Sequence, residues 1–239
     1  MASRALPGLG LKGFWGSGYD GWDGEMDTNL LTMSVLLNGT VKSATTSLPG
    51  SPTNGDIYIV KVGDPNAGKV AVRDVGAWVY LTPARGWRLW VDDALQYRTY
   101  DGAVWVIENE LLSTSVVSGS AVALTTNTAA NAMSIANVPK GDWDISINAA
   151  FLPGATTSIT ELLASISVAS GTIDTTPGRF NSLPMAAFVP GANPMSLVVP
   201  SHRITLASTS TLYFVARGKF TVAGLGVYGS LTARRAKLG

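Results

Sequence analysis

Apolar residues occur along most of this chain in short runs separated by Gly, Pro, Asn and Asp, a pattern typical of strands joined by turns. Residues 27–37 differ, because apolar side chains would cover most of their surface if they formed a helix. Asp27 suits the N-cap of such a helix, and Asn38-Gly39 suits its end. We therefore predict one helix over residues 27–37, with most of its surface buried.

The region after this helix has the pattern of a small antiparallel β domain. The predicted strands are residues 56–62, 69–73, 77–81, 86–91, 97–100 and 104–107. Asp101-Gly102 lies between two aromatic strands and is a good hairpin signal.

The second half of the chain also consists of predicted strands, which are longer and separated by Gly, Pro, Ser and Thr. They are residues 121–125, 142–151, 162–168, 196–199, 204–206, 212–220 and 225–232. Residues 171–191 contain Pro177, Pro184 and Pro190 and are predicted to be a long loop. Strands at this spacing suggest a β-sandwich of the jelly-roll type.

The density of charged residues along the chain falls near residue 112. Residues 1–111 contain 21 charged side chains, residues 112–233 contain nine, and the last six positions contain three. We predict a boundary at 110–118, with a small β domain at 26–110 and a sandwich at 112–239. Residues 1–25 precede both, and their seven glycines between positions 8 and 24, with Phe14, Trp15, Tyr19 and Trp22, indicate an extended arm.

Composition narrows the classes of function. Charged residues make up 14% of the chain, against roughly 25% in an average soluble domain. A surface this poor in charge is expected to be covered by a partner. The net charge of +1 favours neither nucleic acid nor an anionic membrane as partner. The N-terminus lacks the apolar core of a secretory signal, and no apolar run approaches the ~20 residues of a membrane-spanning helix.

Catalytic and metal-binding patterns are scarce. The chain has no Cys and a single histidine, His202, which excludes thiolate metal sites and two-histidine metal sites. Asp142 and Asp144 share one face of a predicted strand, where they are expected to be solvated rather than to act as a glycosidase pair. We expect no enzymatic activity, no cofactor and no metal.

Residues 63–69, Gly-Asp-Pro-Asn-Ala-Gly-Lys, match the first seven positions of a phosphate-binding P-loop. The eighth position requires Ser or Thr and is Val70. The residues that follow Lys69 alternate like a strand, whereas a P-loop is followed by a helix. A hairpin loop is therefore predicted instead.

Seven tryptophans are a notable number for this length, and four of them, Trp78, Trp87, Trp90 and Trp105, lie in the small β domain. They are candidates for stacking on a glycan. Trp87 and Trp90 are three residues apart, so a regular strand places them on opposite faces and at least one of them in the core. Core packing is the favoured interpretation of this aromatic content.

Gly55-Asp-Ile-Tyr-Ile-Val60, Gly76-Ala-Trp78, Pro83-Ala-Arg-Gly-Trp87 and Tyr100-Asp-Gly-Ala-Val-Trp105 together resemble a domain of unknown function, DUF2793. That family occurs in phage and prophage tail-fibre-like proteins and in gene-transfer-agent particles, and the resemblance covers residues 8–107. Gly141-Asp-Trp-Asp144, Tyr213-Phe-Val-Ala-Arg217 and residues 228–235 more loosely resemble the terminal domains of phage fibres, which are commonly homotrimers.

These resemblances imply a structural protein of a tailed-bacteriophage virion, made in the host cytoplasm. It would be a short fibre or spike, or an adaptor, for particle attachment or host-surface recognition. A head decoration or head-fibre protein of the capsid and a carbohydrate-binding module are the alternatives. The expected partners are further copies of the chain in a homotrimer, other virion proteins and a host surface glycan. The C-terminal Arg234, Arg235 and Lys237 are expected to form a basic cluster in the trimer.

Overall fold

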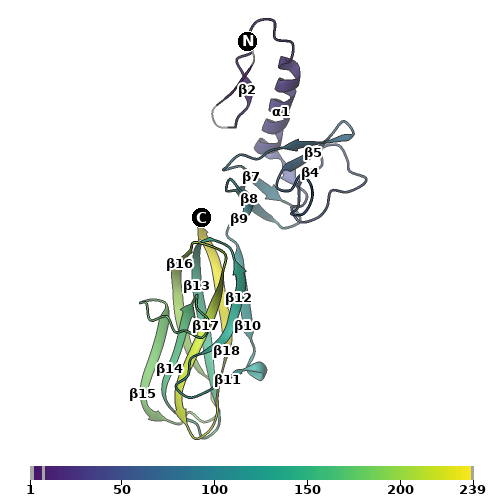
Figure 1. Ribbon diagram of the computed structural model, residues 1–239. Helices are drawn as coiled ribbons and strands as arrows, with labels where there is room; N and C mark the ends of the chain where they lie inside the picture. Colours follow the sequence, from purple (N-terminus) through teal and green to yellow (C-terminus); the bar gives the residue numbers. More distant parts are fainter. Residues whose placement is uncertain (1–2, 7–8, 238–239) are drawn as a thin grey trace. The chain divides into compact units, whose positions relative to one another are not determined.

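The computed structural model describes residues 3–6 and 9–237, and the chain divides into two compact units, residues 1–108 and 109–239 (Figure 1). We call these the N-terminal unit and the C-terminal unit. Apart from one α-helix and one short 3-10 turn, the regular structure described in both units consists of strands. This confirms the predicted fold class, a mainly β protein with one short helix.

The N-terminal unit begins with a two-stranded hairpin, β1 (Arg4–Ala5) and β2 (Lys12–Gly13), followed by helix α1 (Trp22–Asn38). Asn29 joins the two, since its side chain accepts a hydrogen bond from the Lys12 N–H (2.9 Å) and donates one to the Lys12 carbonyl (2.8 Å). Part of the predicted arm at 1–25 is therefore folded onto the helix. Residues 1, 2, 7 and 8 of that arm lie outside the described residues.

Helix α1 differs from the predicted helix in two respects. It begins at Trp22, five residues before the predicted N-cap Asp27, because the acidic Asp23 and Glu25 of its first turn suit the positive end of the helix dipole. The helix is also less buried than predicted, since Leu30 is 55% exposed and Leu37 is 78% exposed.

Two small sheets complete the N-terminal unit. One has the order β3-β7-β8-β9, and the other has the order β4-β5-β6. Their strands are β3 (Thr40–Val41), β4 (Ile57–Ile59), β5 (Val70–Asp74), β6 (Ala77–Leu81), β7 (Arg88–Val91), β8 (Gln96–Tyr100) and β9 (Trp105–Ile107). All pairs are antiparallel except β3 with β7. Strand β3 was not predicted, whereas the other six strands overlap the predicted ranges. The inward side chains of the two sheets form one core with Val35 of the helix.

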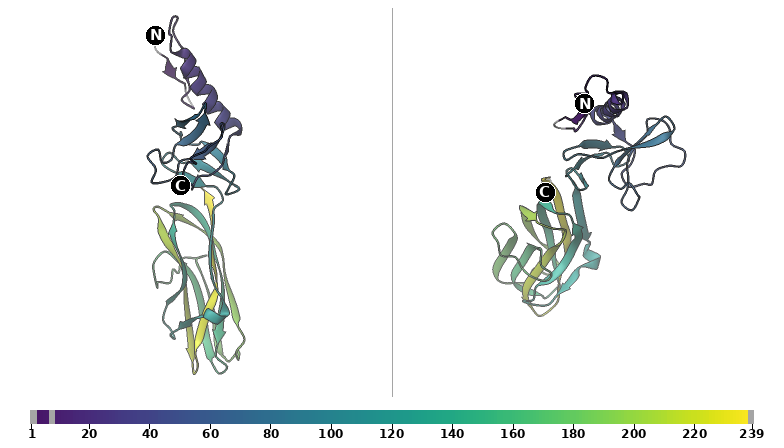
Figure 2. Two further views of the ribbon diagram at one scale, coloured as in Figure 1. Left: turned by 90° about the vertical axis from the view of Figure 1, so that its right-hand side faces the viewer. Right: turned by 45° about the horizontal axis from the view of Figure 1, so that its top comes forward.

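The C-terminal unit is a sandwich of two sheets with the orders β10-β18-β13-β16 and β12-β17-β14-β15 (Figures 1 and 2). Numbered from one to eight without the short β11, these orders are 1-8-3-6 and 2-7-4-5, which is the jelly-roll topology. The strands are β10 (Leu111–Val116), β11 (Val122–Leu124), β12 (Ala130–Val138), β13 (Gly141–Pro153), β14 (Ser158–Ser167), β15 (Phe180–Phe188), β16 (Met195–Leu206), β17 (Ser210–Thr221) and β18 (Leu225–Lys237). A 3-10 turn, η1 (Ser118–Ser120), lies between β10 and β11.

Buried and outward-facing side chains alternate along the strands, and the buried ones form the core between the two sheets. On β13 the odd-numbered residues from Trp143 to Phe151 are buried, and the polar residues between them face outward. The opposite sheet is also covered on its outer face, because the loop at 168–179 lies across β14. There the Ser165 hydroxyl donates to the Asp174 carbonyl (3.1 Å) and accepts from its N–H (3.0 Å). Most apolar residues of β14 and β17 are thus buried within one chain.

Two predictions in this unit are wrong. The predicted loop at 171–191 contains β15, in which Pro184 is tolerated because an edge strand leaves one row of N–H groups unpaired. The predicted strands 196–199 and 204–206 are one strand, β16, with an irregular register near Pro200.

The prediction that Arg235 belongs to a basic cluster at the C-terminus is also wrong. The alternation of β18 leaves Arg234 exposed and buries Arg235, which is 3% exposed. The side chain of Lys237 lies outside the described part of the chain, as do residues 238 and 239 of the predicted domain.

Candidate functional site

The loop at 63–69 joins the antiparallel strands β4 and β5. Lys69 is followed directly by β5 instead of a helix, and its ammonium donates to the Asn66 side-chain oxygen at 3.0 Å. The far side of the loop is held by Trp105, whose indole N–H donates to the Gly68 carbonyl at 2.8 Å. The loop is therefore the hairpin connection that the sequence predicts, and it lacks the strand-to-helix context of a P-loop.

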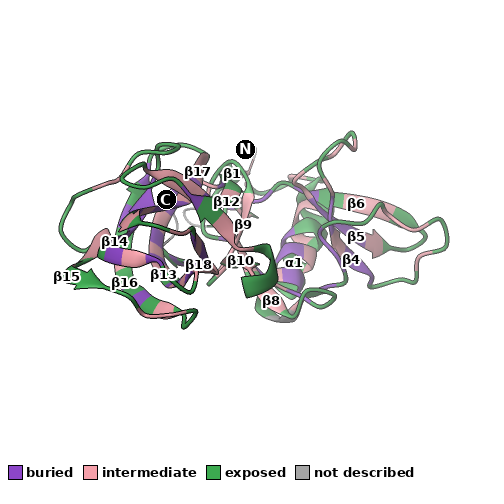
Figure 3. Ribbon diagram, turned by 90° about the horizontal axis from the view of Figure 1, so that it is seen from below, coloured by how far each residue is buried: buried purple, intermediate pink, exposed green. Residues whose placement is uncertain are grey.

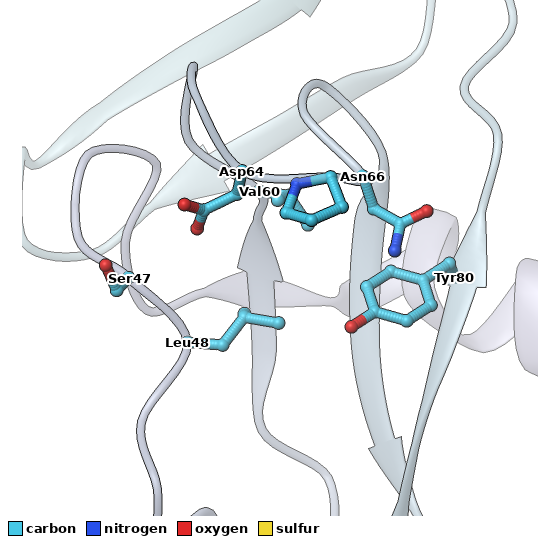
Figure 4. Close-up of a pocket in the computed structure, with 7 residues that line it drawn as sticks. Ser47, Leu48, Val60, Asp64, Asn66 and Tyr80 are labelled. Carbon is cyan, nitrogen blue, oxygen red and sulfur yellow. The ribbon is translucent and has the colours of Figure 1, made fainter.

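This loop forms one wall of a pocket of about 280 Å³. The lining residues come from three segments and are Ser47, Leu48, Val60, Asp64, Pro65, Asn66 and Tyr80. Figure 4 shows Ser47 and Asp64 on one side of the opening and Asn66 and Tyr80 on the other, with Leu48 between them. The pocket thus combines a carboxylate, an amide and two hydroxyls with an apolar floor.

An aromatic face adjoins this pocket on the sheet β4-β5-β6. The register places Tyr58 and Tyr80 on either side of Ala71, and it places Trp78 opposite Arg73 on the same face. The Tyr58 and Trp78 rings meet edge to face, with centroids 5.9 Å apart, and the Arg73 guanidinium lies 5.7 Å from the Trp78 ring centroid. The other face of the sheet packs in the core. We call Tyr58, Trp78 and Tyr80 the aromatic face.

The four tryptophans predicted as glycan-stacking candidates do not share one surface. Trp87 is 5% exposed and lies in the core, whereas Trp90 is on the opposite face of its strand and packs edge to face on Tyr97, 5.0 Å away. Trp105 is on the same face as Tyr100, which the strand alternation places opposite to that of Tyr97. Of the four, Trp78 belongs to the aromatic face, whose Tyr80 lines the pocket. Tyr58 and Tyr80 were missed because only tryptophans were considered.

Asp142 and Asp144 lie on one face of β13, as predicted, and both are engaged by β16. Arg203 donates to the two oxygens of Asp144 (2.9 and 3.0 Å), and the Thr205 hydroxyl donates to Asp142 (2.6 Å). The hydrogen bonds from Arg203 lower the pKa of the Asp144 carboxyl from its ordinary value. Both carboxylates are thus held in side-chain contacts between β13 and β16.

His202 and the acidic residues form no metal centre in the described part of the chain. His202 is half-buried on β16 beside Gly178, where an added Cβ would lie 2.5 Å from the imidazole Nδ1. Within residues 3–6 and 9–237, no group of three or more His, Asp or Glu side chains is placed to hold an ion. Over the same residues, no helix is long and apolar enough to cross a membrane.

The C-terminal unit carries an uncharged edge. Strands β15 and β16 are the terminal strands of the two sheets, and no charged residue occurs between Arg179 and Arg203. The Asn181 side chain bridges them by donating to the Val198 carbonyl at 2.8 Å. Figure 3 shows β15 largely exposed. We call the exposed apolar residues here the edge surface; they are Leu183 (40% exposed), Phe188 (50%), Val189 (53%) and Val198 (50%).

Comparison with known proteins gives one family match. Residues 26–106 match the family described as "Protein of unknown function (DUF2793)". No curated protein matches the chain.

Among solved structures, chains from particles of infectious bursal disease virus are similar to this one. The T13 viral particle gives 11% identity and a TM-score of 0.37, with 80% of this chain and 52% of that chain covered. The Gx strain gives 11% identity and a TM-score of 0.32, with 80% and 54% covered. The chain therefore spans about half the length of these viral chains.

Proposed function

We propose that this protein is a non-enzymatic structural subunit of a tailed-bacteriophage particle and that it assembles as a homotrimer through its C-terminal unit. The observation that carries this proposal is the edge surface on β15 and β16. Jelly rolls recur in viral capsid and lectin domains, but a fold does not by itself define a function. The argument therefore depends on the chemistry of this edge.

Edge strands of monomeric proteins are usually protected by charged side chains, because their free backbone groups can pair with another chain. Strand β15 has no charge along its nine residues, and its exposed Leu183 and Phe188 would meet water in a monomer. A neighbouring copy that covers this edge would remove that apolar area from water and satisfy part of the free backbone. Closed rotational symmetry then limits growth to a defined oligomer.

The N-terminal unit supports the placement in a particle. Its match to DUF2793 covers residues 26–106, and the family resemblance implies phage tail-fibre-like and gene-transfer-agent proteins. Within a virion, the chain would serve as a short fibre, a spike or an adaptor for attachment or host-surface recognition. A head decoration or head fibre is the alternative location, and a cryo-EM map of the intact particle decides between head and tail.

Light scattering on the full chain tests the assembly. We expect a mass about three times the 24.9 kDa of the chain at micromolar concentration. The double variant Leu183→Glu/Phe188→Glu should be monomeric, because it places two charges on the edge surface. The control is Val117→Glu, which changes an equally apolar and 68% exposed residue beside β10, the strand at the opposite end of its sheet. A wild-type monomer, or a trimer that both variants retain, would refute the proposal.

The absence of catalysis has its own test. We expect the protein to leave host polysaccharides uncleaved, since Asp142 and Asp144 are both engaged by side chains of β16. Incubation with host capsule or lipopolysaccharide, followed by chromatography of released sugars, measures this. Release of sugars that disappears in Asp142→Asn or Asp144→Asn would show that the protein is an enzyme.

A further inference from the structure

The pocket at the 63–69 loop contains polar groups that are not used by the protein itself. Over the described residues, no hydrogen bond or ion pair engages the side chains of Ser47, Asp64 or Tyr80. The Asn66 side-chain oxygen accepts from Lys69, which leaves the amide NH₂ for another partner. Four polar groups from three separate segments therefore converge on one opening (Figure 4).

The chemistry of these groups selects the class of ligand. Asp64 is an acceptor and carries a negative charge, so it disfavours phosphates and other anions. Lys69, the cation at the end of this loop, is already bound to Asn66. Ser47 and Tyr80 supply hydroxyls that donate or accept, and the Asn66 NH₂ donates. This set fits a neutral ligand with several hydroxyl groups, two of which can donate to the Asp64 carboxylate.

The apolar lining and the size of the pocket narrow the class further. Leu48, Val60 and Pro65 provide surface for C–H groups, which a sugar ring presents on its faces while its hydroxyls point outward at its edge. The volume of about 280 Å³ lies near the lower limit of about 300 Å³ for pockets that hold drug-sized molecules. A single sugar unit matches both the volume and the mixed polarity.

The aromatic face provides a path for the units that follow. Tyr80 belongs both to the pocket and to this face and is 37% exposed, with Tyr58 and Trp78 beside it on the same side of the sheet. Aromatic side chains combine an apolar ring with a polar group, so they suit the alternating C–H and hydroxyl surface of a glycan.

We propose that this pocket binds one neutral sugar unit of a surface polysaccharide, with Asp64 accepting from its hydroxyls, and that the glycan chain continues over the aromatic face. This inference rests on the proposed role at a host surface and adds its ligand class. A single small site of this kind binds weakly, and presentation of three copies in one trimer raises the overall avidity by roughly 10²–10⁴ where the geometry permits simultaneous contacts.

Saturation-transfer NMR on the full chain tests the ligand class directly. The probes are glucose, galactose, mannose and N-acetylglucosamine, with glucuronic acid and inorganic phosphate as anionic counter-probes. We expect at least one neutral sugar to receive saturation, and we expect its affinity to fall roughly tenfold or more in Asp64→Asn, since a hydrogen bond to a charged group is lost. Tyr80→Phe should weaken binding as well.

The matched control is Tyr97→Phe, because Tyr97 is a similarly exposed tyrosine (39%) on the other sheet of the same unit. It should bind the sugar as the wild type does. Circular dichroism and light scattering on every sample establish that the variants are folded and have the same mass. A trimer that binds no neutral sugar would overturn this inference and leave the structural role intact. Equal binding by Asp64→Asn, or preferential binding of phosphate, would also overturn it.

Discussion

Glu110 and Arg235 form an ion pair that joins the two ends of the C-terminal unit, with 2.8 Å between Arg235 Nη2 and Glu110 Oε2. The Arg235 side chain is 2% exposed, and it also donates to the Lys140 carbonyl and lies 4.4 Å from the Trp143 ring centroid. Glu110 directly precedes β10, and Arg235 lies near the end of β18, so the pair fixes the first and last long strands of the sandwich to each other.

Loss of Glu110 should therefore destabilise the C-terminal unit strongly. In Glu110→Ala the buried guanidinium keeps no carboxylate partner, and we expect the free energy of unfolding to fall by about 3 kcal/mol or more. Urea denaturation followed by tryptophan fluorescence measures the change. Asp144→Ala is the control, since the Asp144–Arg203 pair is exposed and should contribute less than about 1 kcal/mol. Equal losses in both variants would contradict the importance assigned to burial.

Gly229 is a second position at which a substitution should strongly lower the stability of the C-terminal unit, because the structure leaves no room for a Cβ atom. Its φ is +137°, and a Cβ there would lie 1.9 Å from the Asn148 carbonyl oxygen on the neighbouring strand. Gly229→Ala should unfold the sandwich or cost more than about 3 kcal/mol, because the obstacle is backbone. Gly224→Ala, which would meet nothing within 4 Å, is the control and should change the midpoint of thermal unfolding little. A Gly229→Ala protein as stable as the wild type would show that β13 and β18 can separate at this position without loss of stability.

The sequence predicts the fold best where side-chain alternation is strict. The alternation around Trp143 places β13 and assigns its faces. The three-residue spacing of Trp87 and Trp90 predicts that at least one of them is in the core, and the structure shows that this one is Trp87. Prediction from the sequence fails where a strand depends on contacts with residues that are distant in the sequence. Pro184 is a loop signal locally, and only its position at a sheet edge makes a strand possible.

In the candidate site, too, the features that depend on neighbouring residues could be predicted, and those that depend on strand pairing could not. The 63–69 loop could be identified as a hairpin from Val70 and the alternation after it. The convergence of Ser47 and Tyr80 on Asp64 depends on the pairing of β4, β5 and β6, and no local pattern records it. The buried state of Arg235 was likewise missed, because its partner Glu110 lies at the other end of the domain.

The stability of the C-terminal unit should decrease in acid through Glu161. Hydrogen bonds from Lys219 and from Arg217 lower the pKa of the Glu161 carboxyl in the folded protein. A lowered folded-state pKa contributes stability that is complete above the ordinary glutamate pKa of about 4.3 and is lost as pH falls through the folded-state value. Thermal unfolding between pH 7 and pH 3 should show this loss. Glu161→Gln should flatten the profile in that window, and an unchanged slope would exclude Glu161 as its origin.

The 63–69 loop should not bind nucleotide despite its resemblance to a P-loop. The ammonium of Lys69 is held by Asn66, and Asp64 within the loop would repel a phosphate. Calorimetry with ATP and Mg²⁺ should give no binding at micromolar protein. Micromolar binding that is lost in Lys69→Ala would contradict this assignment and would also remove the argument for a neutral ligand in the adjoining pocket.

The C-terminal unit should form the homotrimer without the N-terminal unit, provided that the fragment begins at residue 109. This unit has a core of its own and carries the edge surface, so removal of residues 1–108 leaves the proposed contacts in place. A fragment that begins at 112 lacks Glu110 and the Leu111–Arg234 pairing, and Arg235 is left buried without its carboxylate.

We therefore expect fragment 109–239 to give a trimer mass by light scattering and fragment 112–239 to unfold at lower denaturant concentration. Leu183→Glu/Phe188→Glu in fragment 109–239 should give a folded monomer, because both side chains lie on the surface and outside the core. A folded, monomeric wild-type fragment would move the assembly contacts to the N-terminal unit. The exposed Leu30 and Leu37 of α1 would then be the first residues to substitute, since their apolar surface is the largest on that helix besides Trp22.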